Sequence, residues 1–357
     1  MSRDAEILST AETYLRDEVA PNASAIDADP AALKRALDGL GRHDLMALRR
    51  PETFGGPALS EEAFRQFQES VARYSGALAF LQTQHQSAGS MIAKGDNANL
   101  KTEYLPKMGN GERLVGIGFS QLRRPGPPIL SAHPVAGGYR LTGHVPWVTG
   151  HGFYSEFLIG ASLSSGEAVF GIVPFEDRDH EGSIRFSEPM RLVAMESART
   201  VTADLVDWFL PDDLVVYVKP AGWIQNNDMI NVTLQGHFAI GCARAGLDVV
   251  ELAAQRKGHA FLEEAARALA AEIDACRKAM ADSQSNAEMS TEERLGIRAW
   301  AIDLAGRCAH AGVVASSGAA ISLSNPAQRV LREAMVFSVS AQTTPIMDAT
   351  LRRLVRR

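Results

Sequence analysis

The sequence predicts an α+β fold in three consecutive parts: a helical part over residues 1–114, a β part over residues 115–222 and a second helical part over residues 223–357. Apolar residues recur at helical spacing up to about residue 114. They then give way to short alternating runs rich in β-branched and aromatic residues, and helical spacing returns after Trp223. With 357 residues, the chain is long enough for several structural units and a large core.

The first part is expected to be all helical. Its clearest helix start is Ser60, a capping residue type that is followed by Glu61 and Glu62 in the first turn. The Pro- and Gly-rich residues 51–57 predict a loop. The expected helices cover residues 5–20, 31–48, 60–74, 78–94 and 97–105.

The middle and last parts follow the same logic. Short runs bounded by Gly and Pro predict strands over residues 115–120, 138–141, 157–161, 168–174 and 201–209. Long runs at helical spacing predict helices over residues 229–256, 260–282, 291–317 and 326–339. The polar residues 283–290 predict an exposed turn between two of these helices.

Composition narrows the classes of partner. Hydrophobic residues make up 46% and charged residues 22% of the chain, and the net charge is −6, so neither nucleic acid nor an anionic membrane is an expected partner. Cys242, Cys276 and Cys308 lack the spacing of a metal or redox motif, so no metal site is expected. This cysteine usage, an N-terminus without an apolar segment and the lack of a membrane-length apolar run predict a cytoplasmic protein.

Residues 137–150 (GGYRLTGHVPWVTG) are the most informative stretch. A Gly-Gly turn leads into an alternating strand that ends on Trp147 and Thr149. Residues two apart on a strand share a face, so the indole can cover a flat ring while the hydroxyl bonds to its edge. Periodicity alone is also satisfied by a hairpin with an ordinary buried tryptophan.

This stretch resembles the central strand of acyl-CoA dehydrogenases, in which a Trp-Ile/Val-Thr segment lies against the flavin of FAD. Further segments resemble that family in the same order along the chain: residues 45–56, 94–112, 118–121 and 326–334. The resemblance covers nearly the whole chain. It implies an N-terminal helical domain, a central β-barrel domain and a C-terminal four-helix bundle. It also implies bound FAD and a homodimer or homotetramer, because FAD in that architecture lies partly against a neighbouring subunit.

The resemblance also implies which residues bind FAD. Thr149 would reach N5, Trp147 would cover the ring, and Ser120 would keep the hydroxyl that a threonine supplies in the family. Arg256, with Lys257 as the alternative, would reach the FAD of a neighbouring subunit. The full expected set is Phe119, Ser120, Trp147, Thr149, Arg256, Gly318 and Thr343.

Some positions depart from the family pattern. On the adenine side, Val314 replaces a glutamine, and Gly258-His259 replaces a Phe-Gly pair. Arg123 and Arg124 stand in a segment that is acidic in the family, where they would either meet a phosphate or face water.

The catalytic base is the largest departure. Family members remove the α-proton of an acyl-CoA with a glutamate, but Ala341 stands at its usual position and Asn231 at the alternative one. The catalytic residue is therefore unknown from sequence. Asp228, about one turn before Asn231, and His85 are candidates, although a lone helical histidine is more often structural.

Three functions follow as alternatives. The first is an FAD-dependent oxidoreductase that acts on an acyl thioester or a related small molecule through an unusual base. The second is a flavin-dependent monooxygenase on the same fold, which needs no α-proton base. The third is a non-catalytic binding subunit, which the altered adenine-side residues favour.

Overall fold

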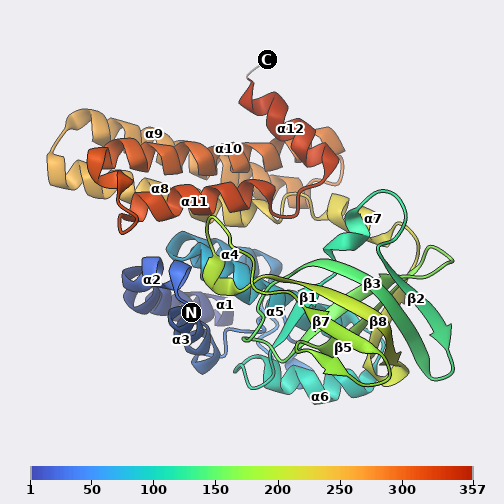
Figure 1. Cartoon of the computed structure of the whole chain (residues 1–357). Coiled ribbons are helices and arrows are strands. Elements are labelled where there is room, and N and C mark those ends of the chain that lie inside the picture. Colours follow the sequence, from blue (N-terminus) through green and yellow to red (C-terminus); the bar gives the residue numbers. More distant parts are fainter. Residues whose placement is uncertain (1, 356–357) are drawn as a thin grey trace.

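A computed structural model, described over residues 2–355, contains helices at both ends of the chain and a mixed sheet between them. The C-terminal helices form a bundle, the N-terminal helices lie against one side of it, and the sheet lies beside them (Figure 1). The predicted order of helical, β and helical parts is confirmed.

The N-terminal helices are largely where the sequence predicts them. Ser60 caps α4 through a hydrogen bond from the Ala63 amide, and Asn97 caps α6 in the same way. The predicted helix 31–48 is too long, because α3 ends at Arg42 and Asp44 adopts a left-handed backbone (φ 54°). The helices are α1 (Arg3–Tyr14), α2 (Ala23–Ala28), α3 (Pro30–Arg42), α4 (Glu61–Tyr74), α5 (Gly76–Lys94) and α6 (Ala98–Met108).

The described residues between α6 and the second helical part form one nine-stranded mixed sheet in the order β6-β7-β8-β3-β2-β4-β5-β9, with β1 paired in parallel to β4. The strands are β1 (Val115–Gly118), β2 (Leu130–Val135), β3 (Gly138–Val148), β4 (Glu156–Ser162), β5 (Ala168–Pro174), β6 (Arg178–Asp179), β7 (Ser183–Phe186), β8 (Val201–Pro211) and β9 (Val215–Lys219).

The sheet curls so that distant strands meet. Gly171 in β5 lies against Leu210 in β8, where an added Cβ would come within 2.6 Å of the leucine side chain. Phe175 beside β5 packs on Phe186 in β7 with ring centroids 5.1 Å apart, and Phe157 in β4 joins them. These aromatic rings fill the interior that the curled sheet encloses.

The C-terminal helices differ from prediction at two places. The predicted helix 229–256 is interrupted between Asn231 and Gln235, where the Thr233 hydroxyl accepts a hydrogen bond from Ser283 of α9. A helix over residues 344–354 was not predicted. The helices are α7 (Trp223–Ile230), α8 (Gly236–Lys257), α9 (Ala260–Ser285), α10 (Thr291–Ser316), α11 (Pro326–Val339) and α12 (Thr344–Leu354).

α8 touches both helical parts of the chain through glycines. A Cβ added at Gly241 would lie 2.3 Å from the carbonyl oxygen of Glu69 in α4, and one added at Gly246 would lie 2.5 Å from the backbone of Cys308 in α10. Only glycine allows backbones to approach this closely. The N-terminal helices and the C-terminal bundle therefore share a continuous core.

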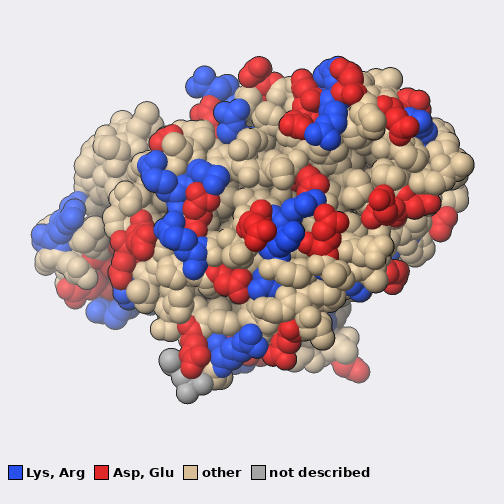
Figure 2. All heavy atoms as spheres, turned by 90° about the horizontal axis from the view of Figure 1, so that it is seen from below, with Lys and Arg blue, Asp and Glu red and all other residues tan. Residues whose placement is uncertain are grey.

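The surface seen in Figure 2 carries intermingled basic and acidic side chains. Within residues 2–355, no helix has the length and apolar character needed to cross a membrane. Cys242, Cys276 and Cys308 are buried and form no disulfide.

Candidate functional site

The ends of β1 and β3 lie together, which brings Ser120 close to Thr149 in the fold. Gly118 sits against the Val148 side chain, 2.9 Å from an added Cβ, so the residues that follow each strand start from neighbouring points. Phe119 packs edge-on against Phe170, with ring centroids 5.6 Å apart, and is buried. Ser120 opens a short 3-10 turn and is partly exposed.

Trp147 and Thr149 differ in environment. Trp147 is 38% exposed, whereas Thr149 is 1% exposed and its hydroxyl lies 3.0 Å from the Thr200 hydroxyl. The pairing of β3 with β8 shifts by one residue between Val145 and Val148, so strict alternation is broken just before Thr149. The expectation that indole and hydroxyl share one face rested on unbroken alternation, and the structure does not support that step.

The adenine-side residues lie elsewhere. Arg256 is exposed near the end of α8, and Gly318 is exposed in the turn after α10. Lys257 Nζ donates to the Ala315 carbonyl at 2.7 Å and to the Ser317 hydroxyl at 2.9 Å. These contacts satisfy acceptors at the end of α10, so Lys257 caps the C-terminus of that helix.

Thr343 and the two positions of the missing base lie on the linkers around α7, α8 and α12. Thr343 precedes α12, and its hydroxyl oxygen is buried without a hydrogen-bond partner among the described residues. Ala341 is exposed in the turn before it, with a left-handed backbone (φ 50°). Asn231 ends α7, and its side-chain amide donates to the Asn227 carbonyl at 2.8 Å.

Asp228 is not free to act as a base. Its carboxylate accepts two hydrogen bonds from Arg123, from Nε at 2.7 Å and from Nη2 at 2.9 Å. This pair ties the turn after β1 to α7, and a Gln225 to Leu122 hydrogen bond of 3.2 Å reinforces it. Arg123 is therefore engaged by protein, and of the two neighbouring arginines only Arg124 is exposed.

His85 is a structural residue. It is fully buried, its Nδ1 accepts from the Val115 amide at 3.0 Å, and its Nε2 lies 3.0 Å from the Met108 carbonyl. It thus joins α5 to the end of α6 and the start of β1. Burial lowers the pKa of His85 to about 4, so the ring is neutral at pH 7.

This burial predicts a pH-dependent stability. The unfolded chain binds a proton at His85 below the ordinary histidine pKa of 6.5, whereas the native protein does so only below about 4. The free energy of unfolding should therefore fall as pH drops through this window, by about 3 kcal/mol from this residue. Urea unfolding from pH 7 to pH 4 measures the slope. His85→Gln should show a flatter dependence, and an equal slope in both proteins would contradict the assignment.

Three polar residues with notable environments were not found from sequence. Thr200 contacts Thr149, and Gln121 donates to the Gly160 carbonyl at 2.8 Å while its own side-chain oxygen lacks a partner among the described residues. Arg298 is buried in α10 at 1% exposure. The sequence does carry a signal for Arg298, because this single arginine stands between the apolar residues Ile297 and Ala299 and further apolar residues follow.

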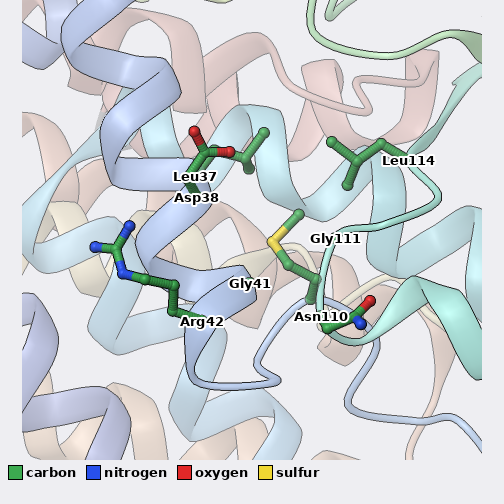
Figure 3. Close-up of a pocket in the computed structure, with 8 residues that line it drawn as sticks. Leu37, Asp38, Gly41, Arg42, Asn110, Gly111 and Leu114 are labelled. Atoms are coloured by element: carbon green, nitrogen blue, oxygen red, sulfur yellow. The ribbon is translucent and has the colours of Figure 1, made fainter.

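A partly open cavity lined by none of these residues lies between α3 and the loop that joins α6 to β1. Its volume is about 360 Å³. Asp38 and Arg42 of α3 lie on one side, and Asn110 and Gly111 lie on the other (Figure 3). Asp38 pairs with Lys34, and Arg42 lies 3.9 Å from Glu18, so opposite charges compensate at its rim.

The sequence is similar to those of known proteins. Residues 2–112 match the family model described as "Acyl-CoA dehydrogenase, N-terminal domain". Isovaleryl-CoA dehydrogenase, mitochondrial, of Oryza sativa subsp. japonica is 24% identical, with 93% of this chain and 86% of that protein covered. A 3-(aryl)acrylate reductase of Clostridium sporogenes is 20% identical, with 70% and 68% covered.

Solved structures share the fold. Butyryl-CoA dehydrogenase from Megasphaera elsdenii superposes with a TM-score of 0.76 at 16% identity, covering 100% of this chain and 99% of that chain. An acyl-CoA dehydrogenase complexed with FAD from Bacillus anthracis gives a TM-score of 0.79 at 19% identity, covering 100% and 67%. At these identities the likeness shows the fold alone.

Proposed function

Since this chain belongs to the acyl-CoA dehydrogenase family, we propose that it is an FAD-dependent oxidoreductase, located in the cytoplasm, that acts on an acyl thioester or a related small molecule. The family supplies the oxidoreductase class. FAD, the substrate and the location are the proposal. The residues at the sheet end and at the turn before α12 are the parts of this chain that would serve such a reaction.

Two observations fit a bound flavin, one at the sheet end and one before α12. The Trp147 indole is 38% exposed although it is large and apolar, so it can lie against a ring. The buried Thr343 hydroxyl lacks a partner among residues 2–355 and can bond to a ligand. A bound flavin would accept or return a hydride, and these side chains would hold its ring and edge. The adenine side fits less well, because Val314 offers no hydrogen bond.

The surroundings of the candidate bases support the proposal that the reaction departs from ordinary dehydrogenation. Asn231 and Ala341 are neutral, Asp228 is held by Arg123, and His85 is enclosed between α5, α6 and β1. A base must lie within hydrogen-bond reach of the proton it removes. We therefore expect low turnover of plain acyl-CoAs. The alternative function, a flavin-dependent monooxygenase, predicts the same result because it needs no α-proton base.

The absorption spectrum of the purified protein tests the proposal, followed by anaerobic bleaching with a panel of acyl-CoAs and a 3-arylacrylate. A yellow protein that an acyl-CoA bleaches, or whose dithionite-reduced flavin a 3-arylacrylate reoxidises, supports an oxidoreductase of that substrate class. A yellow protein that none of them affects favours the monooxygenase. A colourless protein that takes up no added FAD would leave the non-catalytic binding subunit.

Trp147→Ala should weaken flavin binding by roughly 10- to 100-fold, because the ring loses an aromatic wall worth about 1–3 kcal/mol. Trp147→Phe should retain most of the affinity. Thr149→Val should slow flavin reduction more than it weakens binding, because it removes a hydroxyl and keeps the shape. Fluorescence titration with FAD and stopped-flow reduction measure the two effects. Full flavin content and unchanged reduction in all three variants would make this strand purely structural.

We also propose that the protein is a homodimer or homotetramer. Met347, Leu351 and Leu354 are spaced four and three residues apart on α12, and each is 43–56% exposed, so they form an apolar stripe on the surface. Arg256 lies near the end of α8 and Gly318 lies between α10 and the start of α11, whereas Thr343 follows the opposite end of α11 and precedes α12. A second copy that supplies the adenine-side residues would explain this separation.

Light scattering at micromolar concentration should therefore report at least a dimer. Leu351→Glu should weaken the assembly, because it places a charge in the apolar stripe, whereas Leu252→Glu on α8 is the matched control. A monomeric wild-type protein would contradict the assembly. A Leu351→Glu variant that assembles like the wild type would remove α12 from the interface.

A further inference from the structure

Arg298 is the least satisfied buried cation among the described residues. Its Nη2 donates to the Ser340 carbonyl at 3.1 Å, while Nε and Nη1 have no hydrogen-bond partner within residues 2–355. A guanidinium carries five N–H donors and keeps its charge in proteins, so buried donors without acceptors are costly. Burial lowers the pKa of Arg298 to about 10, which leaves it cationic at neutral pH.

The other buried arginines show what is unusual here. Arg329 is paired with Glu333 at 2.7 Å, and Arg50 with Asp44 at 3.0 Å. No carboxylate among the described residues forms an ion pair with Arg298. Buried charges in proteins are normally paired or bound to a ligand. Arg298 therefore has the charge and the donors of an anion site without an internal anion.

The surroundings of Arg298 are apolar. Leu295 and Ile302, three residues before and four after it on α10, belong to a small cluster with Val232 and Ile346. This cluster joins α10 to the linker between α7 and α8 and to α12. An ion pair formed here would be strengthened by the low local dielectric.

Arg298 contacts the neighbour of one position where the resemblance predicts a catalytic glutamate, and residues of its helix pack against the neighbour of the other. Ser340, whose carbonyl it holds, directly precedes Ala341, and Val232 of the cluster directly follows Asn231. Because Ala341 and Asn231 are both uncharged, neither residue neutralises the Arg298 guanidinium. The charge at this point suits binding of an anion rather than removal of a proton.

We propose that Arg298 binds a carboxylate group of the substrate or product, so that the substrate class is a carboxylic acid rather than a neutral acyl group. The identification of this carboxylate as part of a substrate or product rests on the proposed function. The predicted binding of a carboxylate at Arg298 does not. A planar carboxylate is the anion that a guanidinium matches best, and a monoanion costs less to desolvate than a phosphate.

The turn over residues 340–343 adjoins Arg298 through the Ser340 carbonyl, and a ligand would reach the guanidinium by displacing this turn. Ala341 and Gln342 are exposed, while the Thr343 hydroxyl is buried and unpartnered among the described residues. The left-handed backbone at Ala341 (φ 50°) disfavours this conformation for a residue with a Cβ. The turn therefore contains a strained residue, and its rearrangement would relieve that strain.

Calorimetric titration of the full chain with sodium crotonate and with crotonamide, its neutral counterpart, tests the inference. Crotonate should bind and raise the melting temperature, whereas crotonamide should do neither. Arg298→Met should weaken crotonate binding by at least about tenfold, and Arg298→Lys by less, because it keeps the charge. Arg267→Met, which changes an exposed arginine of α9, is the matched control and should bind like the wild type.

Equal binding of crotonate and crotonamide by the wild type would overturn the inference, and this comparison needs no variant to fold. Undiminished crotonate binding by folded Arg298→Met would also overturn it. Titrations of flavin-loaded protein and of protein without flavin separate this result from the proposed function. Charge-selective binding without any flavin uptake would sustain the carboxylate site and refute the oxidoreductase.

Discussion

Ala341→Glu is expected to raise the rate of acyl-CoA dehydrogenation by about 10² to 10⁴, the usual contribution of a positioned general base. The substitution places a carboxylate where the family carries its base, on an exposed turn that has room for the longer side chain. Arg298, which holds the carbonyl of the preceding Ser340, would favour the ionised form, and that form accepts the proton. Anaerobic reduction of the flavin by butyryl-CoA measures the rate.

The matched control is Ala341→Gln, which has the same size and cannot accept a proton at neutral pH. It should reduce flavin as slowly as the wild type. A flavin-loaded Ala341→Glu protein that is no faster than Ala341→Gln would show that the pocket is no longer arranged for thioesters. Rapid turnover by the wild type would instead mean that another residue already acts as the base.

Glu333→Ala is expected to reduce the free energy of unfolding by about 3–5 kcal/mol. Glu333 is fully buried, accepts from Arg329 at 2.7 and 2.8 Å, and accepts from the Gly76 amide at 3.1 Å. The substitution would leave a buried guanidinium without its counter-ion and the first amide of α5 without an acceptor. Urea unfolding monitored by circular dichroism measures the loss.

Asp348→Ala is the control for this result, because Asp348 pairs with Arg352 at 2.9 Å on the exposed surface of α12. Such an exposed pair is screened by solvent, so this variant should unfold much like the wild type. The double variant Arg329→Met, Glu333→Leu should lose less than Glu333→Ala, since it removes both charges together. A loss below about 1 kcal/mol for Glu333→Ala would show that this part of the core tolerates an isolated charge.

The sequence predicts helix starts well because capping is local. Ser60 begins α4 and Pro326 begins α11 at the expected residues, since a cap and a first-turn proline depend only on neighbours in the chain. Helix ends are less predictable from the sequence, because they depend on contacts with distant residues. The apolar residues 45–48 continue the helical spacing of α3 although the chain turns at Asp44, and the break after Asn231 involves contacts with α9.

The candidate site could be predicted only where it depends on residue identity. The neutral residues at positions 231 and 341 are visible in the sequence itself. The different burial of Trp147 and Thr149 is not, because it accompanies a register shift set by pairing with β8. The engagement of Asp228 by Arg123 joins residues 105 positions apart, a separation at which no local pattern operates.

The glycine contacts of α8 bear on how the chain can be divided. Along the sequence the molecule has three parts, but the first and last are one folding unit, because the α8 backbone rests directly on α4 at Gly241 and on α10 at Gly246. A fragment that stops near residue 222 would leave the α4 surface beneath Gly241 open to water and prone to aggregate. The β part, by contrast, is a single continuous insertion between the two halves of this unit. Removing it would break the hydrogen bonds that join it to α2 and α5, from the Met195 amide to the Asp27 carboxylate and from the Tyr154 hydroxyl to the Leu81 carbonyl, both 2.6 Å.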